Sequence, residues 1–523
     1  MANASDIAAE PHLQSLRLLS PGWCYIGASA ALLSLWVGYY LFDPFGFDEP
    51  GRDSWHHVAV LRELMAAPFD PSNPHIPTNE PSRYFTPVTI VAALFGKFFG
   101  MSPYQLFGCM GAASCLGLVV ACWAFARRYY ESPWAPLLLL LTLLFAWGAQ
   151  TGHVGLHNYD TLLSGAAYPS IIALVLGLFS WAFVLRILQS GRDGPAALIG
   201  LGALTAVILL THQLSGVIVL VGAASLILFH ADTGAKSKAR LLAAMALGCL
   251  STLAWPYFQV VDIVTSVSDA RWRSPSEGIN HISTMLMLMA PSLIGILGFR
   301  RADGGLRWEL LFPAALFGIG YIILTIQGSA IAHRLPPALI LFNQLGLVWL
   351  ILAYAEKTDR AEMKMAISVA MGVLISISAV TSGVRRLHDL QTRASEGSML
   401  AMTEEMAAHL PQGSIAFATE NVVFPLQSTG RRVVSIPRPE PAAPSLGARQ
   451  RATDRFFDPT TTEAERRRLI ARWGATHVVS SSVGLEPAVM RDLRLLGRST
   501  RLSHGAEIIT INQPHNRPQK AVP

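Results

Sequence analysis

The sequence predicts a mainly α-helical, polytopic membrane protein with about eleven transmembrane helices and a small α/β domain at its C-terminal end. Three observations lead to this fold class. Charged residues make up only 14% of the 523 positions, against about 25% in soluble domains. Apolar runs of bilayer-spanning length recur between residues 22 and 383, and a helix can satisfy its own backbone in lipid. From residue 384 the composition becomes that of a soluble domain.

The predicted spans are apolar runs, and cations collect in every second loop between them, as expected of cytoplasmic loops. We therefore expect a cytoplasmic N-terminus and an external C-terminal domain. The membrane that we expect is a bacterial inner (plasma) membrane. The spans cover roughly residues 22–42, 104–126, 134–150, 168–189, 195–211, 215–230, 241–258, 284–299, 309–327, 335–354 and 365–383. The loop cations are Arg127, Arg128, Arg192, Lys236, Lys238, Arg240, Arg300, Arg301, Arg307, Lys357, Arg360 and Lys364.

The loop over residues 43–86, after the first span, is predicted to lie outside and to carry helices along the membrane. Apolar and polar residues alternate at helical spacing over 55–65, and Asp53 is a good N-terminal cap for that helix. The apolar segment 87–100 is too short to span the bilayer. We expect it to form an interfacial or re-entrant helix, with Lys97 extending its amine toward water.

We expect two domains, a transmembrane domain over residues 1–383 and a soluble α/β domain over 384–523. Short β-branched segments alternate with helical ones in the second, and the Pro-rich stretch 437–446 is predicted to be a surface loop. The predicted strands are Ile415–Ala418, Arg432–Ile436, His477–Ser481 and Glu507–Ile511, and the predicted helices are 398–410, 462–473 and 485–496.

Cysteines and net charge exclude two classes of feature. All five cysteines (Cys24, Cys109, Cys115, Cys122 and Cys249) lie in apolar runs, so no structural disulfide is expected. The net charge of +6 comes from cations spread over loops, which gives no case for nucleic-acid binding.

Polar residues gather at the external ends of the predicted spans, where unforced charges are uncommon because insertion costs about 2.5–3.5 kcal/mol each. This asymmetry predicts an external active site. An acid at the start of a membrane-surface helix fits a base that takes a proton from a substrate hydroxyl, and we select Asp53, with Asp48 second. The candidate substrate-binding residues are Glu49, His56, His57, Arg83, Tyr84, His157, Asp160, His212, Arg271, Arg273, His333 and Arg334.

Each candidate also has a purely structural interpretation, which the residues alone leave open. Asp53 can be only a helix cap, and His56 with its neighbour can form a solvated face. Arg83 suits either a lipid contact or a bidentate phosphate contact. His212 can be a turn residue whose hydrogen bonds are satisfied locally, or it can contact a phosphate or substrate. A divalent metal fits the helical turn from Asp53 to His57 only with two more ligands from other loops, so no cofactor is certain.

Together these features resemble the GT-C family of membrane glycosyltransferases, which includes the aminoarabinose transferase of lipid A and the protein mannosyltransferases. The corresponding pieces here are Asp48-Glu49 or Asp53, then Leu61-Arg62-Glu63-Leu64, then Arg83-Tyr84-Phe85-Thr86-Pro87. The last resembles the transferase motif Arg-Tyr-Phe-Glu-Lys-Pro but lacks its lysine, which transfers that phosphate role to Arg83. The second external acid of the family matches Asp160.

The resemblance implies a polyprenyl-phosphate-linked sugar as donor and a glycan, lipid or protein as acceptor. A loop aspartate would deprotonate the acceptor hydroxyl, and the sugar would be transferred with inversion. Two other functions remain open: a secondary transporter or lipid-carrier flippase, whose functional acid would lie mid-span, and a non-catalytic subunit of cell-envelope glycan assembly.

Overall fold

The structure is a computed structural model that describes part of the chain. It describes residues 20–42, 53–147, 157–267, 283, 286–287, 289–357, 369–370, 372–373, 376–377, 380, 384, 399–437, 440, 442–481, 485–503 and 505–512. The chain divides into two compact units. The first is drawn from Met1–Phe42, Gly111–Ala254 and Val264–Val384, and the second from Asp43–Met110, Trp255–Ile263 and Arg385–Pro523.

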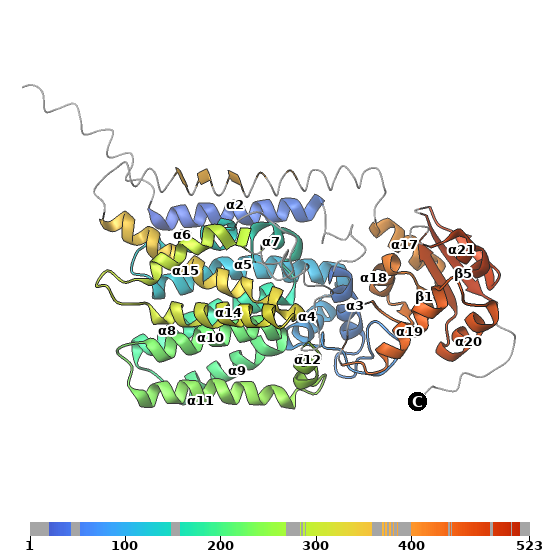
Figure 1. Ribbon diagram of the computed structural model, residues 1–523, viewed down its shortest axis with the longest axis horizontal. Helices are drawn as coiled ribbons and strands as arrows, with labels where there is room; N and C mark the ends of the chain where they lie inside the picture. The colour runs from blue at the N-terminus through green and yellow to red at the C-terminus, as the bar shows by residue number, and fades with distance from the viewer. Residues whose placement is uncertain are drawn as a thin grey trace, which may run out of the picture. The chain divides into compact units, whose positions relative to one another are not determined.

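The first unit is a bundle of apolar helices (Figure 1). Its elements are α2 (Pro21–Phe42), most of α5 (Pro103–Tyr129), α6 (Ala135–Phe145), α7 (Tyr159–Gly165), α8 (Pro169–Ser190), α9 (Pro195–Thr211), α10 (Gln213–Phe229), α11 (Ala235–Ser251), η3 (Thr252–Ala254), η4 (Ile294–Phe299), α14 (Trp308–Ile326), η5 (Ala330–Arg334) and α15 (Pro336–Lys357). Among the described helices, four are long and apolar enough to cross a membrane, namely α5, α8, α14 and α15.

Prolines set the starts of several of these helices, because proline has no N–H to leave unpaired in the first turn. Pro169 and Pro195 open α8 and α9. Within the bundle α8 packs against α9 and α10, α9 against α11, and α14 against α15. Most of the predicted spans coincide with helices of this unit, so the mainly helical fold is confirmed, although the count of eleven spans is not.

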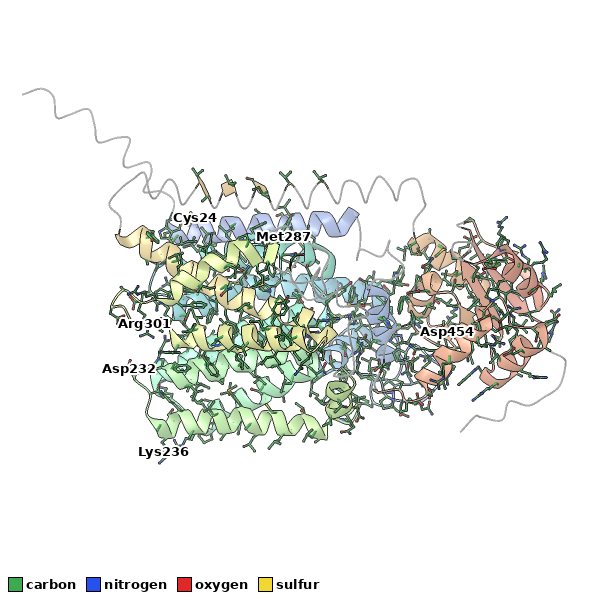
Figure 2. The ribbon with its side chains drawn as sticks, in the orientation of Figure 1. Cys24, Asp232, Lys236, Met287, Arg301 and Asp454 are labelled. Atoms are coloured by element: carbon green, nitrogen blue, oxygen red, sulfur yellow. The ribbon has the colours of Figure 1, made fainter. Side chains whose placement is uncertain are left out.

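The cationic loops meet at one end of the bundle. Arg240 pairs with Asp193 and Arg301 with Glu309, each at 3.3 Å. Figure 2 shows Asp232, Lys236 and Arg301 at this same end. These loops of the first unit therefore lie together, and their cations are partly paired with acids.

Not every predicted span coincides with a helix of the same bounds: the one placed at 134–150 corresponds to the shorter α6, Ala135–Phe145. The span placed at 241–258 begins earlier, at Ala235, and its α-helix ends at Ser251, because the lysines and arginine before it are helical as well. Trp255 and Tyr257 belong to the second unit. The predicted span 365–383 lies almost wholly outside the described residues.

Close backbone contact joins η4 to α15. A Cβ atom added at Gly295 would lie 1.8 Å from the carbonyl oxygen of Asn343, and one at Gly298 equally close to that of Gly346. Only glycine permits this approach, as at small-residue contacts between transmembrane helices.

The second unit combines the loop that follows the first span with the C-terminal part of the chain. Its helices are α3 (Asp53–Ala66), α4 (Pro87–Phe98), the start of α5, part of α12 (Val260–Val267), α17 (Met399–His409), α18 (Glu420–Ser428), α19 (Leu446–Phe457), α20 (Glu463–Trp473) and α21 (Pro487–Arg494). The helices predicted at 55–65 and 87–100 are thus both present.

A five-stranded sheet forms the C-terminal part, in the order β2-β1-β3-β5-β4. Its strands are β1 (Ile415–Ala418), β2 (Arg432–Val433), β3 (His477–Ser481), β4 (Gly497–Arg501) and β5 (Ala506–Ile511). β1 is parallel to β2 and β3, whereas β5 is antiparallel to β3 and β4. Phe417 and Phe456 stack in its core with ring centroids 4.0 Å apart. The small α/β arrangement is as expected.

One expectation for this part is wrong. The stretch 437–446 is not a surface loop where it is described, because Glu440, Ala442 and Ala443 are buried. Glu440 accepts hydrogen bonds from the loop near Ser82 and Arg83, and this long-range contact covers the stretch.

Candidate functional site

Helix α3 places the selected acid and the two neighbouring histidines on one face. Asp53 is its first residue and is half-buried, and His56 and His57 follow at the i+3 and i+4 positions. Both histidines are buried, with 1% and 6% of their surface exposed. A solvated histidine face, one of the open interpretations, is therefore excluded.

His56 forms a buried pair with His75 from the loop after α3. Their Nδ1 and Nε2 atoms lie 3.0 Å apart and the rings meet edge to face. Phe424 of α18 covers His56, with ring centroids 4.5 Å apart. Burial lowers the pKa of His56 well below its usual value, and burial followed by the charge of Arg432 lowers the pKa of His75 to about 3. Both imidazoles are thus neutral at pH 7.

Arg83 is held by neighbours rather than left open to solvent. Its Nη2 donates to the Tyr84 hydroxyl at 3.1 Å, and its backbone N–H donates to Glu440 at 3.2 Å. Burial lowers the pKa of Arg83, but Tyr84 and Glu440 raise it more. Burial also raises the pKa of Glu440, which the charge of Arg83 opposes. The charge of Arg83 therefore stabilises the buried carboxylate of Glu440, whatever else Arg83 binds.

Arg62 and Glu63, from the Leu61-Arg62-Glu63-Leu64 motif of α3, bind that helix to the C-terminal part of the same unit. Arg62 Nε donates to the Ser428 carbonyl at 2.8 Å, and Glu63 forms an ion pair with Arg432 at 2.6 Å. Arg432 also donates to the carbonyl of Asn73. The motif thus sets the position of the helix that carries Asp53.

Helix α4 is amphipathic and leaves an apolar face uncovered. A capping box between Thr86 and Thr89 starts it, and one side packs on Val60 and Leu64 of α3. The other side is exposed at Val91, Leu94, Phe95, Phe98 and Phe99. Lys97, expected to reach toward water, donates to the Ala66 carbonyl at 3.3 Å instead.

In the first unit, His157 lies in a buried polar cluster. His157 Nε2 and Gln344 Oε1 are 2.9 Å apart, and the indole of Trp147 meets the imidazole edge to face at 4.8 Å. Gln344 Nε2 also contacts the Ala146 carbonyl at 3.3 Å. Asn343 and Gln344 are both fully buried in α15. His157 lies two residues before the start of α7, the helix that contains Asp160.

The other sequence-selected residues are placed as follows. His212 caps α10, since its Nδ1 accepts from the Ser215 backbone N–H at 3.2 Å, which matches the structural interpretation of this residue. His333 and Arg334 end the short helix η5. Asp48, Glu49, Arg271 and Arg273 lie outside the described residues. Among the residues that are described, no group of three His, Cys, Asp or Glu is arranged to hold a metal ion, and all five cysteines are free.

Comparison with solved structures identifies the fold. The mycobacterial arabinofuranosyltransferase AftD matches 95% of this chain with a TM-score of 0.58 at 13% identity. The chain has the fold of the GT-C membrane glycosyltransferases. At this identity the likeness is one of fold, and the chain spans 40% of the length of AftD.

Two further GT-C structures give lower scores. ArnT from Cupriavidus metallidurans in the apo state matches 92% of this chain and is itself covered to 98%, at 16% identity and a TM-score of 0.49. The Archaeoglobus fulgidus oligosaccharyltransferase in its apo form matches 91% of this chain over 73% of its own length, at 10% identity and with a TM-score of 0.47. No protein-family model and no curated protein matches the sequence.

Within this GT-C fold, sequence reasoning missed several residues that build the buried polar clusters of each unit. His75, Arg432 and Glu440 were interpreted as parts of coil, strand and surface loop. The partner of His75 lies 19 residues away, and those of Arg432 and Glu440 lie more than 350 residues away. Gln344 and Asn343 interrupt the apolar run of α15. A polar pair within a transmembrane run is a signal that was available in the sequence.

Proposed function

We propose that the protein is a membrane glycosyltransferase that moves a sugar from a polyprenyl-phosphate donor to an acceptor hydroxyl at the external membrane surface. The observation that carries the proposal is the GT-C fold over 95% of the chain, together with the position of Asp53 at the start of α3. The donor, the base and the location are our inference from this combination.

In the proposed reaction Asp53 takes the proton of the acceptor hydroxyl while its oxygen attacks the anomeric carbon. The bond from that carbon to the phosphate oxygen breaks, and its electron pair leaves with the polyprenyl phosphate. The products are an inverted glycoside and the lipid phosphate, whose charge needs nearby donors. Arg83 is our first candidate, and Asp48 remains the second candidate base.

The lipid donor is supported by α4. Its exposed aromatic and aliphatic face suits the boundary of the hydrocarbon, and its buried face packs on the helix that begins with Asp53. A donor carried in the bilayer would reach the acid along this surface. Among the described bundle helices, acidic residues occur only at helix ends, as at Glu309 and Glu356, which disfavours a transporter with a mid-span acid.

The test is sugar transfer by the purified full chain in liposomes, with polyprenyl-phosphate-linked arabinose, aminoarabinose and mannose as donors. We expect Asp53→Asn to fold and to lose about 10²–10⁴-fold in kcat. Asp70→Asn, which changes an exposed acid of the same loop, should keep full activity. Full activity in both Asp53→Asn and Asp48→Asn would refute a loop aspartate as base. If substitution of the loop acids has no effect and the chain binds a partner protein, a non-catalytic subunit would be favoured instead.

A further inference from the structure

The two edges of the C-terminal sheet differ in what covers them. Val433 of the edge strand β2 turns its backbone N–H away from β1 and donates it to the His75 carbonyl at 3.1 Å. The loop after α3 therefore covers the β2 edge. Strand β4 forms the opposite edge of the sheet, and α21 packs against β4.

The outer side of β4 carries backbone groups without a partner. In an antiparallel ladder, successive residues alternate between bonding the neighbouring strand and pointing away from it. The Leu502 N–H donates to the Ala506 carbonyl at 2.8 Å, so the register of β4 with β5 assigns the bonds between them to residues 498, 500 and 502. The N–H and C=O groups of Ser499 and Arg501 therefore point outward, and no described residue bonds to them. Such an edge can accept a further strand.

The side chains along this edge are cationic. Arg498 and Arg501 are both exposed, and neither forms an ion pair with a described residue. Arg501 faces Glu507 across the ladder, but Arg494 binds that carboxylate at 2.7 and 2.8 Å. Directly before the strand, Leu495 is 61% exposed. The edge therefore combines unpaired backbone, positive charge and an apolar side chain.

These charges disfavour two occupants from this protein itself. Antiparallel pairing of two copies about Ser499 would bring Arg498 of both copies to diagonal positions of one face, and pairing about Thr500 would do the same to Arg501. Diagonal neighbours lie within reach of long side chains, and like charges there repel. The C-terminal tail, residues 513–523, contains no acid and is interrupted by prolines, which cannot donate to a ladder.

We propose that the outer edge of β4 binds an extended acidic segment of a partner polypeptide, which pairs with Ser499 and Arg501 as a further strand of the sheet. Two carboxylates three residues apart on that segment would meet Arg501 on one face and Arg498 on the other, because side chains alternate along a strand. This binding activity goes beyond sugar transfer and does not depend on the identity of the base or the donor.

Hydrogen exchange at single-residue resolution tests the pairing. The probe is the capped peptide Val-Glu-Val-Thr-Glu-Val, added to the full chain in detergent micelles. We expect binding with a Kd below about 1 mM and amide exchange at Ser499 and Arg501 at least about tenfold slower with saturating peptide. The amides of Arg498 and Thr500 already bond to β5 and should not change. A weaker Kd, or binding without slower exchange at 499 and 501, would overturn the proposal.

A methylated peptide separates strand pairing from attraction between charges. Methylation of the backbone nitrogens of the first glutamate and the threonine removes the N–H groups that would face β4 and keeps both carboxylates. This peptide should bind at least about tenfold more weakly. Equal affinity would show that the arginines attract any polyanion, and the proposed strand pairing would be wrong.

Charge reversal tests the two arginines. Arg498→Glu/Arg501→Glu should weaken binding of the glutamate peptide by about tenfold and favour the same peptide with lysines in place of glutamates. Arg468→Glu, at an exposed position of α20, should change neither affinity. Retained protection of the Ile509 amide, which faces β3, shows that the sheet is intact. A double variant that keeps the intact sheet and the preference for glutamate would contradict the assignment.

Discussion

Oε2 of Glu63 lies 2.6 Å from Nη2 of Arg432, although 369 residues separate them in the sequence. The other carboxylate oxygen of Glu63 accepts from the Ser72 backbone N–H at 3.0 Å, and Arg432 reaches the Asn73 carbonyl. One ion pair therefore joins the end of α3, the loop that follows it and the edge strand β2.

Removing one member of this pair should loosen α3. Both side chains are largely covered, with 17% and 20% exposed, so Glu63→Gln or Arg432→Met should each lower the free energy of unfolding of the second unit by about 1–3 kcal/mol. Hydrogen exchange of residues 57–66 in the full chain measures this. Glu463→Gln breaks an exposed pair with Arg467 and should cost under about 0.5 kcal/mol. Additive effects in the double variant would contradict a direct coupling.

Stability should fall in acid because of the His56–His75 pair. Both folded-state pKa values lie below the ordinary value of about 6.5, so the unfolded chain binds more protons. The contribution is complete above about pH 6.5 and decreases as the pH falls toward the folded pKa, by up to about 1.4 kcal/mol per pH unit for each ring. Thermal unfolding between pH 4 and 8 measures the slope.

A substitution isolates this effect. His75→Gln should flatten the pH dependence, whereas His409→Gln, at an exposed position of α17, should leave it unchanged. An unchanged slope in His75→Gln would show that the acid sensitivity has another source.

Arg83 can be tested for a structural role and a phosphate role separately. Arg83→Met removes a positive charge that stabilises the buried Glu440 carboxylate, although the backbone N–H of residue 83 still donates to it, and should destabilise the second unit by about 1–3 kcal/mol. The double variant Arg83→Met/Glu440→Gln removes that charge and should recover most of the loss. If Arg83 also binds the donor phosphate, the double variant should fold but retain a raised donor KM. Recovery of both stability and KM would leave Arg83 a purely structural role.

The exposed face of α4 should contact lipid. In a variant without the five native cysteines, an environment-sensitive fluorophore attached at position 98, where Phe98 is 81% exposed, should be quenched by spin-labelled lipids. The same fluorophore at exposed position 70 should not. Equal quenching at both positions would contradict an interfacial helix.

The local sequence pattern predicted those helices and strands whose formation depends on their own residues. The helix predicted at 168–189 is α8, and the strand predicted at Ile415–Ala418 is β1. The apolar run and the β-branched segment each carry their own signal. Helix α3 was likewise visible from its periodicity, and with it the placement of Asp53, His56 and His57 on one face.

Elements that depend on distant partners were missed. Helix α18 contains Pro425 and two adjacent valines, which oppose helix formation locally, and packing against α3 compensates. β4 reads Gly-Arg-Ser-Thr-Arg without apolar alternation, and it exists because β5 pairs with it. His75 joins the cluster around His56, and Gln344 the cluster around His157, only through contacts across 19 and 187 residues, which spacing along the chain does not reveal.

The glycine contact between η4 and α15 also limits how a long lipid tail could enter or leave the bundle. With backbone against backbone at Gly295 and Gly298, no layer of side chains separates the two segments, so neither can swing aside by a change of rotamer. If the proposed polyprenyl-phosphate donor enters the bundle, its lipid chain would therefore have to pass along a different seam, and substitution of either glycine by alanine would push these two backbones apart.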